Sequence, residues 1–167
     1  MTDHATHQEA VAKIVALIKD IEFGMLTTTD AEGRLHSRPM SSNKDIEFDG
    51  DAWFFTYGSA PKVHDIENKP YVNVAFSDPK SQAYVSLSGR AELVRDPETL
   101  KQHWHPSLKA WFPKGLDEPD LALIKVNADQ GEYWDSPASA IAHAISFAKG
   151  ALTGKPAQSG ENEKVDL

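Results

Sequence analysis

A series of short segments, each ended by residues that favour a tight turn, constrains the fold of this chain more than any other feature. Threonine and apolar residues dominate segment 23–29, and the turn after it places Gly33 where a hairpin needs a left-handed residue. Val72, Val74 and Phe76 alternate with other side chains, as in a strand with one buried face. The same signals predict strands over 23–29, 34–41, 52–56, 71–76, 82–94, 121–126 and 130–135.

These segments favour a mainly β fold over a parallel nucleotide-binding sheet. Strands and helices do not alternate regularly, and no glycine-rich phosphate loop follows a strand. Short strands at antiparallel spacing, with a few short helices, are typical of a β-barrel or a sandwich. We therefore expect an antiparallel, Greek-key-like β fold with flanking helices.

Helices are expected where apolar residues recur every three or four positions or where capping signals occur. Ser59 stands before a proline and is expected to cap the helix that follows it. Asp96 stands before a second proline and is expected to do the same. The expected helices span 9–21, 61–68, 97–104 and 138–152.

The length of 167 residues suits one ordinary domain. Residues 1–8 are polar and are expected to be a flexible N-terminus, with the folded domain over 9–152. The segment 153–167 is polar, with Gly, Pro, Ser and Glu, and is expected to be a disordered tail.

Composition excludes several classes of site and partner. The chain contains no cysteine, so thiolate metal sites, disulfides and cysteine nucleophiles are excluded. The formal net charge of −8 argues against broad nucleic-acid binding, because phosphate backbones require a basic face. No apolar run approaches the ~20 residues that cross a bilayer, and no signal pattern opens the chain, so a cytoplasmic protein is expected.

Two segments have the residue types that bind anions. Arg38 lies on an expected edge strand directly before Pro39, which cannot donate to a ladder, and its planar fork suits a phosphate or an electron-rich ring. Thr56, Ser59 and Lys62 surround a helix start, where free N–H groups attract phosphate. The simpler interpretations are an exposed edge arginine and an ordinary helix cap beside a solvated lysine.

Aromatic residues form a third candidate region. Trp111 and Phe112 lie in a loop bounded by prolines, and Trp134 lies in the last expected strand. Such side chains stack on planar cofactors, but they equally suit local packing or a dimer contact.

The histidines and serines give no independent sign of catalysis or metal binding. His103 and His105 form a His-x-His pair at a helix end without a third ligand nearby, so no metal site is predicted. No Gly-x-Ser-x-Gly motif is present, so a serine hydrolase is not supported.

The order of these segments resembles the pyridoxamine 5′-phosphate oxidase-like family of flavin-binding split barrels, and within it the bacterial general stress proteins. No single segment is specific, but the ordered set spans about residues 11–137. The matching segments are Phe23-Gly24-Met25-Leu26-Thr27-Thr28, His36-Ser37-Arg38-Pro39-Met40, Trp53-Phe54-Phe55-Thr56, Ser59 to Val63, Tyr84 to Ala91, Trp111 to Gly115 and Glu132-Tyr133-Trp134-Asp135.

The resemblance implies a homodimer of split barrels with FMN at the interface, and FAD as the alternative flavin. Arg38, Pro39 and Met40 would lie along the isoalloxazine ring. Phe55 and Thr56 would supply contacts near the ribityl chain and the phosphate, and Ser59 and Lys62 would hold the phosphate. Tyr84, Trp111 and Trp134 would lie near the flavin, with the Trp111 loop a candidate contribution from the partner subunit.

One departure from the family bears on activity. True pyridoxamine phosphate oxidases hold their substrate phosphate with an arginine and a histidine near the C-terminus, whereas this chain has no arginine after Arg95. The resemblance therefore implies a flavin-dependent oxidoreductase of undefined substrate rather than a true member of that enzyme group. The alternatives are a flavin-binding or flavin-sensing stress protein without turnover, and a barrel that holds a deazaflavin or a haem, with His64 or His103 as the weak axial candidates.

Overall fold

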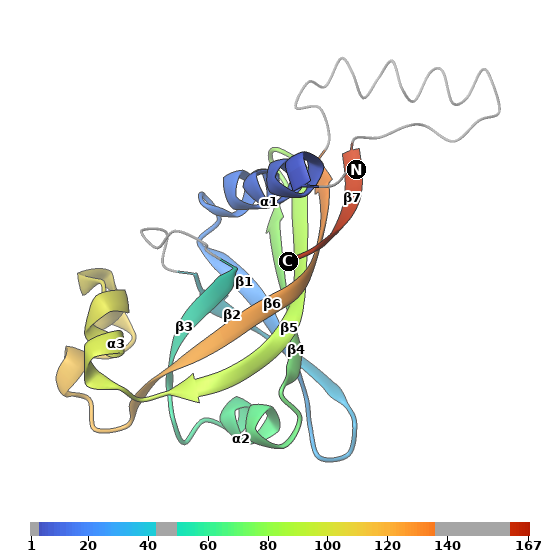
Figure 1. Ribbon diagram of the computed structural model, residues 1–167. Coiled ribbons are helices and arrows are strands. Elements are labelled where there is room, and N and C mark those ends of the chain that lie inside the picture. Colours follow the sequence, from blue (N-terminus) through green and yellow to red (C-terminus); the bar gives the residue numbers. More distant parts are fainter. Residues whose placement is uncertain (1–3, 43–49, 136–160) are drawn as a thin grey trace, which may run out of the picture.

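A single antiparallel sheet of seven strands forms the framework of the computed structural model, which describes residues 4–42, 50–135 and 161–167. Figure 1 shows the sheet curling around its own core. The strand order is β2-β1-β4-β5-β6-β3, and β7 pairs with β6. The strands are β1 Phe23–Thr29, β2 Leu35–Ser41, β3 Asp51–Tyr57, β4 Tyr71–Asp78, β5 Ala83–Val94, β6 Leu121–Asp135 and β7 Glu161–Asp166. The expected mainly β architecture with flanking helices is confirmed.

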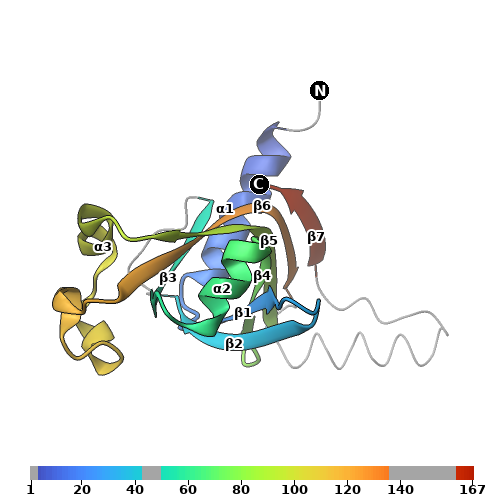
Figure 2. The same ribbon diagram turned by 90° about the horizontal axis from the view of Figure 1, so that it is seen from below.

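Short helices cover the ends of the barrel. Helix α1 (His4–Ile18) lies at the end nearer both termini, and α2 (Pro61–Asn68) lies at the opposite end (Figures 1 and 2). Helix α3 (Pro97–His103) and the 3-10 helices η1 (Pro106–Ala110) and η2 (Gly115–Asp117) form a lobe beside β3. Asp96 caps α3 as predicted, because its side chain accepts a hydrogen bond from the backbone N–H of Thr99 at 3.0 Å. None of the described helices is long and apolar enough to span a membrane.

The barrel interior is filled from alternate positions of the strands. Ala83, Val85, Leu87 and Ala91 of β5 are buried on one face, at the two-residue spacing of a strand. Ile14 from α1 is fully buried against the same core, so the apolar face of that helix closes the barrel end.

A second, smaller core lies between the outer side of β3 and β6 and the α3–η1 segment. Its buried members are Phe55, Leu100, Leu108, Phe112, Leu121 and Leu123. Residues 121–124 are all buried because both faces of β6 are covered at this point. This second core fixes the aromatic lobe against the barrel.

Two predictions for the end of the fold are wrong. Segments 121–126 and 130–135 form one continuous strand, β6, rather than two strands joined by a turn. The reason is that β3 pairs with the first half of β6 and β7 with the second half, so the ladder has no break. Asp129 of β6 is the extra residue of a β-bulge, because Ser88 of β5 pairs with Gln130 and Gly89 pairs with Ala128.

The predicted disordered tail also contains a strand. Glu161–Asp166 pairs with β6, and Val165 is buried in the main core. Beyond the end of β3, the edge of β6 would otherwise expose unpaired backbone groups, which β7 satisfies. At the other end, α1 begins at His4, inside the segment 1–8 that was expected to be flexible. The helix expected over 138–152 lies outside the described residues.

Candidate functional site

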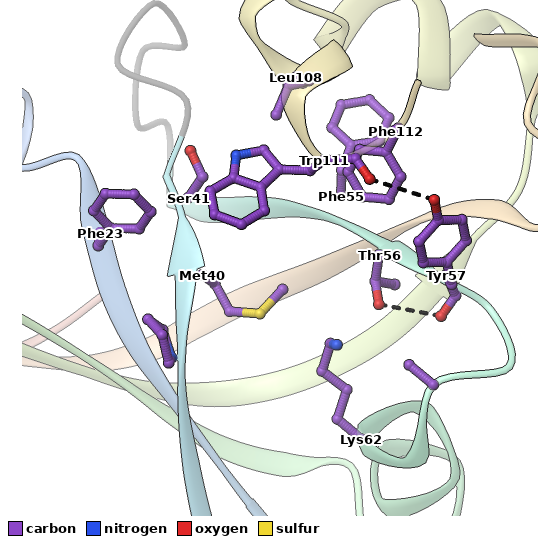
Figure 3. Close-up of a pocket in the computed structure, with 12 residues that line it drawn as sticks. Phe23, Met40, Ser41, Phe55, Thr56, Tyr57, Lys62, Leu108, Trp111 and Phe112 are labelled. Carbon is purple, nitrogen blue, oxygen red and sulfur yellow. Dashed lines mark hydrogen bonds between the residues drawn. The ribbon is translucent and has the colours of Figure 1, made fainter. Parts of the chain in front are cut away.

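A pocket of about 280 Å³ opens between the β1–β2 edge, the β3–α2 connection and the aromatic lobe (Figure 3). It brings together side chains that are far apart in the sequence. Its lining residues are Phe23, Pro39, Met40, Ser41, Phe55, Thr56, Tyr57, Ala60, Lys62, Leu108, Trp111 and Phe112. Six of the ten predicted flavin contacts are therefore in one place: Pro39, Met40, Phe55, Thr56, Lys62 and Trp111.

Aromatic rings form one wall of the pocket. Phe55 and Phe112 belong to the second core, with ring centroids 6.1 Å apart. The hydroxyl of Tyr57 donates a hydrogen bond to the backbone oxygen of Trp111 at 3.3 Å, which links the lobe to the end of β3. Trp111 itself is 61% exposed, and Figure 3 shows its indole between Ser41 and Phe55 at the pocket. A planar ring system would find apolar surfaces on both sides here.

A single cation marks the other end of the pocket. Lys62 lies in the first turn of α2 and is half-buried. Burial, followed by repulsion from Arg38, lowers the pKa of Lys62 below its ordinary value. No carboxylate among the described residues forms an ion pair with Lys62. A partly desolvated ammonium without a counter-charge is suited to receive an anionic ligand group.

Ser59 does not act as sequence reasoning predicts. The N-cap of α2 is Ala60, with no side-chain cap hydrogen bond. Ser59 instead donates to Asp120 through its hydroxyl at 2.6 Å and its backbone N–H at 2.9 Å. The local sequence favours Ser59 as the N-cap of α2. The carboxylate of Asp120, 61 positions later, instead accepts hydrogen bonds from both the hydroxyl and the backbone N–H of Ser59. These two hydrogen bonds fix the loop before α2. Ser59 does not line the pocket.

Arg38 lies on the edge strand β2, as predicted, but its guanidinium is directed into the protein. Its Nη1 donates to the Thr28 hydroxyl at 2.8 Å and to the Leu26 carbonyl at 3.2 Å. The side chain is 24% exposed and does not line the pocket, so the interpretation as an exposed edge arginine is wrong. Its position close to the ring of a flavin stays a prediction.

Tyr84 and Trp134 lie elsewhere on the surface of this chain. They are directly opposite each other on β5 and β6 and are 41% and 40% exposed. Strand register places them on the same outward face of the sheet as Phe23, Met25 and Pro39. We call these five residues the apolar face. Because Phe23 and Pro39 also line the pocket, the apolar face begins at its rim.

Sequence reasoning missed several lining residues. Phe23, Ser41, Tyr57, Ala60 and Leu108 all reach the pocket. Phe23 is a large apolar residue at the exposed start of a strand, which is the one signal that could have drawn attention to it. The others depend on how the lobe folds back over β3, which no local pattern predicts.

The histidines considered as haem ligands lie away from the pocket. His103 stacks on Trp53 with ring centroids 4.1 Å apart, and the exposed His64 lies 3.7 Å from Glu67 on α2. Neither lines the pocket. Among the residues that the structure describes, no group of three or more His, Cys, Asp or Glu could hold a metal ion.

Comparison with known proteins places the chain in one family. The profile of proteins described as pyridoxamine 5′-phosphate oxidase-like matches residues 9–158. The chain is 30% identical over 145 residues to the protein bli-3 of Neurospora crassa, covering 81% of this chain and 69% of that protein. A crystal structure from Jannaschia sp. CCS1, described as a general stress protein 26, matches with a TM-score of 0.75 and 25% identity, covering 96% of this chain and 99% of that one.

A further similar structure belongs to a protein that is named for flavin binding. The general stress FMN/FAD binding protein from Xanthomonas citri is 28% identical with a TM-score of 0.68, covering 79% of this chain and 92% of that one. These matches agree with the curled antiparallel sheet of this chain. The residues that line the pocket all lie within the range 9–158 that the family profile matches. The chain therefore belongs to the pyridoxamine 5′-phosphate oxidase-like family, among its general stress proteins.

Proposed function

We propose that this chain binds a flavin in the pocket beside Lys62, with FMN as the first ligand and FAD as the alternative. The observation that carries the proposal is the position of Lys62, a half-buried cation without an ionic partner among the described residues, at one end of an aromatic pocket. A flavin mononucleotide has the matching shape, because its planar ring is joined to a terminal phosphate. The Xanthomonas citri relative, which is described as binding FMN or FAD, supports the same ligand class.

The pocket residues divide into two groups under this proposal. Met40, Phe55 and Trp111 would contact the ring system, because they supply apolar and aromatic surface. Lys62 would hold the phosphate, and the buried Thr56 lies between the two groups. When bound, a flavin supplies hydride and electron transfer, and the protein supplies binding and orientation.

We further propose that a second copy of the chain completes the site. The volume of about 280 Å³ is slightly below the roughly 300–1,000 Å³ typical of small-molecule sites. The apolar face (Phe23, Met25, Pro39, Tyr84 and Trp134) starts at the open rim and extends over the sheet. A homodimer through this face would cover it and would bring Tyr84 and Trp134 toward the partner's flavin, while Trp111 would serve the site of its own chain.

Two roles for the bound flavin follow from the lining. The first is a flavin-dependent oxidoreductase of undefined substrate, and the second is a flavin-binding or sensing protein without turnover. No histidine or carboxylate lines the pocket, so among the described residues only Lys62 and Tyr57 offer a group that could act as a general acid or base there. A reductase would reduce its flavin with NADH or NADPH faster than free FMN is reduced, and equal rates would favour the non-catalytic role for these donors.

The phosphate assignment is tested by comparing FMN with riboflavin, which lacks the phosphate. Loss of one charged hydrogen bond corresponds to about 1.5–3 kcal/mol, so Lys62→Ala should raise the Kd for FMN about 10- to 100-fold. The Kd for riboflavin should change little. Lys114→Ala is a matched control, because Lys114 is exposed and does not line the pocket. An unchanged Kd for FMN in Lys62→Ala would refute the assignment.

A further inference from the structure

A buried threonine joins the side chains of Arg38 and Asp65. Thr28 on β1 is fully buried, and its hydroxyl accepts a hydrogen bond from Arg38 Nη1 at 2.8 Å. The same hydroxyl donates a hydrogen bond to Asp65 Oδ2 on α2 at 2.7 Å. One hydroxyl group therefore links β1, β2 and α2, and a charged side chain fixes both its donor and its acceptor direction.

The two charges themselves are not in hydrogen-bond contact. Arg38 Nη2 lies 3.9 Å from Asp65 Oδ2, which is too long for a hydrogen bond. Arg38 Nη1 also donates to the carbonyl oxygen of Leu26 at 3.2 Å. Within the described part of the chain, Nε and Nη2 of Arg38 donate no hydrogen bond. Strand β1 thus holds one corner of the guanidinium, and its other N–H groups are available to a ligand.

Arg38 lies next to the end of the pocket that Lys62 marks. Arg38 and Met40 are two positions apart on β2, so their side chains share one face of the strand, and Met40 lines the pocket. Burial and then repulsion from Arg38 lower the pKa of Lys62, so the two cations are close enough to interact. Two neighbouring cations that are partly removed from water are unfavourable unless an anion accompanies them. The phosphate of the proposed ligand would supply that anion.

We propose that Thr28 is a positioning residue, which holds the Arg38 guanidinium beside Lys62 so that both cations meet the phosphate of the ligand. Asp65 acts through Thr28, because the hydrogen bond that it accepts turns a lone pair of the hydroxyl toward Arg38. Without this hydroxyl, Arg38 is free to close the 3.9 Å gap to Asp65, and its charge is then neutralised within the protein. Thr28 does not line the pocket, so its effect on the ligand passes through Arg38.

The inference rests on the proposed flavin site and is tested with the ratio of the Kd for riboflavin to the Kd for FMN. This ratio reports the contribution of the phosphate, and a general loss of stability would not change it. Thr28→Val keeps the shape of the side chain but removes the hydroxyl, and it should lower the ratio about 5- to 10-fold. Thr28→Ser keeps the hydroxyl and should give the ratio of the wild type.

A double-mutant cycle shows whether Thr28 acts through Arg38. Arg38→Met removes the guanidinium and should lower the ratio about 10-fold or more, as expected for a lost charged hydrogen bond. In the Arg38→Met background, Thr28→Val should lower the ratio by no more than about twofold, because no guanidinium is left to position. If the two effects add in full, Thr28 acts by another route and the inference is overturned.

The outcomes separate the inference from the proposed function. If the wild type binds FMN no better than riboflavin, the phosphate site itself fails and the inference fails with it. If Lys62→Ala lowers the ratio but Thr28→Val does not, the flavin site stands and the positioning role is overturned. If Arg38→Met weakens the binding of both ligands equally, the guanidinium contacts the ring system rather than the phosphate. The flavin site again stands, and the inference is overturned.

Thr27→Val is the matched control on the same strand. Thr27 faces the opposite side of β1 from Thr28, its hydroxyl lies in hydrogen-bond contact with Ser37 Oγ at 2.7 Å, and it does not line the pocket. The control should leave the ratio unchanged. A fall there would show that the loss of any β1 hydroxyl lowers the ratio, and it would overturn the inference. If Thr28→Val does not fold, Thr28→Ala takes its place with the same expected fall, and an unchanged ratio in that variant overturns the positioning role.

Discussion

The hydroxyl of Ser59 donates a hydrogen bond to the carboxylate of Asp120 at 2.6 Å, and this bond ties the loop before α2 to the start of β6. Asp120 directly follows the aromatic lobe and also lies 3.5 Å from Arg95. The hydrogen bonds from Ser59 are the main cause of the lowered pKa of Asp120. The contact therefore connects the two sides of the pocket, the lysine of α2 and the lobe that carries Trp111.

The stabilising effect of this contact should depend on pH. A carboxyl group whose pKa is lowered in the folded state stabilises the protein above its unfolded pKa and loses that effect as the pH falls toward the folded pKa. Ser59→Ala should therefore lower the melting temperature at neutral pH. The difference from the wild type should shrink below about pH 4. A difference that is the same at both pH values would contradict the role of the Asp120 charge.

Trp111 should contribute to ligand binding but little to folding. Its side chain is 61% exposed, so little buried surface is lost in Trp111→Ala and the melting temperature should be unchanged. Aromatic stacking contributes about 0.5–1.5 kcal/mol, so the Kd for FMN should rise about 2- to 10-fold. Leu116→Ala, another exposed apolar residue of the lobe, is the control and should bind FMN as the wild type does. Equal affinities of the two variants would place the flavin away from Trp111.

Gly89 should be intolerant of any side chain. A Cβ at this position would lie 2.0 Å from the backbone oxygen of Asn127 and 2.7 Å from Cα of Ala128, so it meets backbone atoms that cannot move aside. Gly89→Ala should lower the free energy of unfolding by about 1–3 kcal/mol or more. Glu92→Ala, on the exposed face of the same strand, serves as the control in urea unfolding. A wild-type midpoint for Gly89→Ala would show that β5 and β6 are not in this register.

The apolar face should mediate self-association. Trp134→Glu places a charge within the proposed contact between two copies, and a buried unpaired charge is strongly unfavourable. We expect the wild type to run at twice the mass of one chain in light scattering and Trp134→Glu to run as a monomer. Leu116→Glu adds the same charge at an exposed apolar residue outside the apolar face and should remain dimeric. A monomeric wild type at micromolar concentration would refute the dimer.

Much of the fold can be predicted from periodicity and turn signals. The alternation in β5 gives its buried face correctly, and Asp96 before a proline gives the start of α3. The continuity of β6 is not evident from its sequence, because Asn127 and Asp129 suggest a turn. Pairing with β3 and β7 decides the outcome there. The strand β7 cannot be predicted from its sequence for the same reason. Its segment is polar, and it forms a strand because it pairs with the open edge of β6.

The residues of the site likewise differ in whether their roles can be predicted from the local sequence. Lys62 and the aromatic residues can be recognised from their segments, because each stands beside a strand end or a helix start. The partners of Ser59 and Arg38 cannot be recognised in this way. Ser59 is held by a carboxylate 61 positions away, and Arg38 donates hydrogen bonds to Thr28 and Leu26 on the neighbouring strand β1. Their hydrogen-bond partners, rather than their residue types, set their roles.

The most direct test of the central proposal is a titration of the purified chain with FMN, followed by flavin fluorescence and visible absorption. The proposal predicts saturable quenching at about one FMN per chain, because each copy would bind one FMN in the pocket beside Lys62. Circular dichroism of the same sample establishes that it is folded. If a folded sample gives no saturable change with FMN or with FAD, the pocket beside Lys62 is not a flavin site.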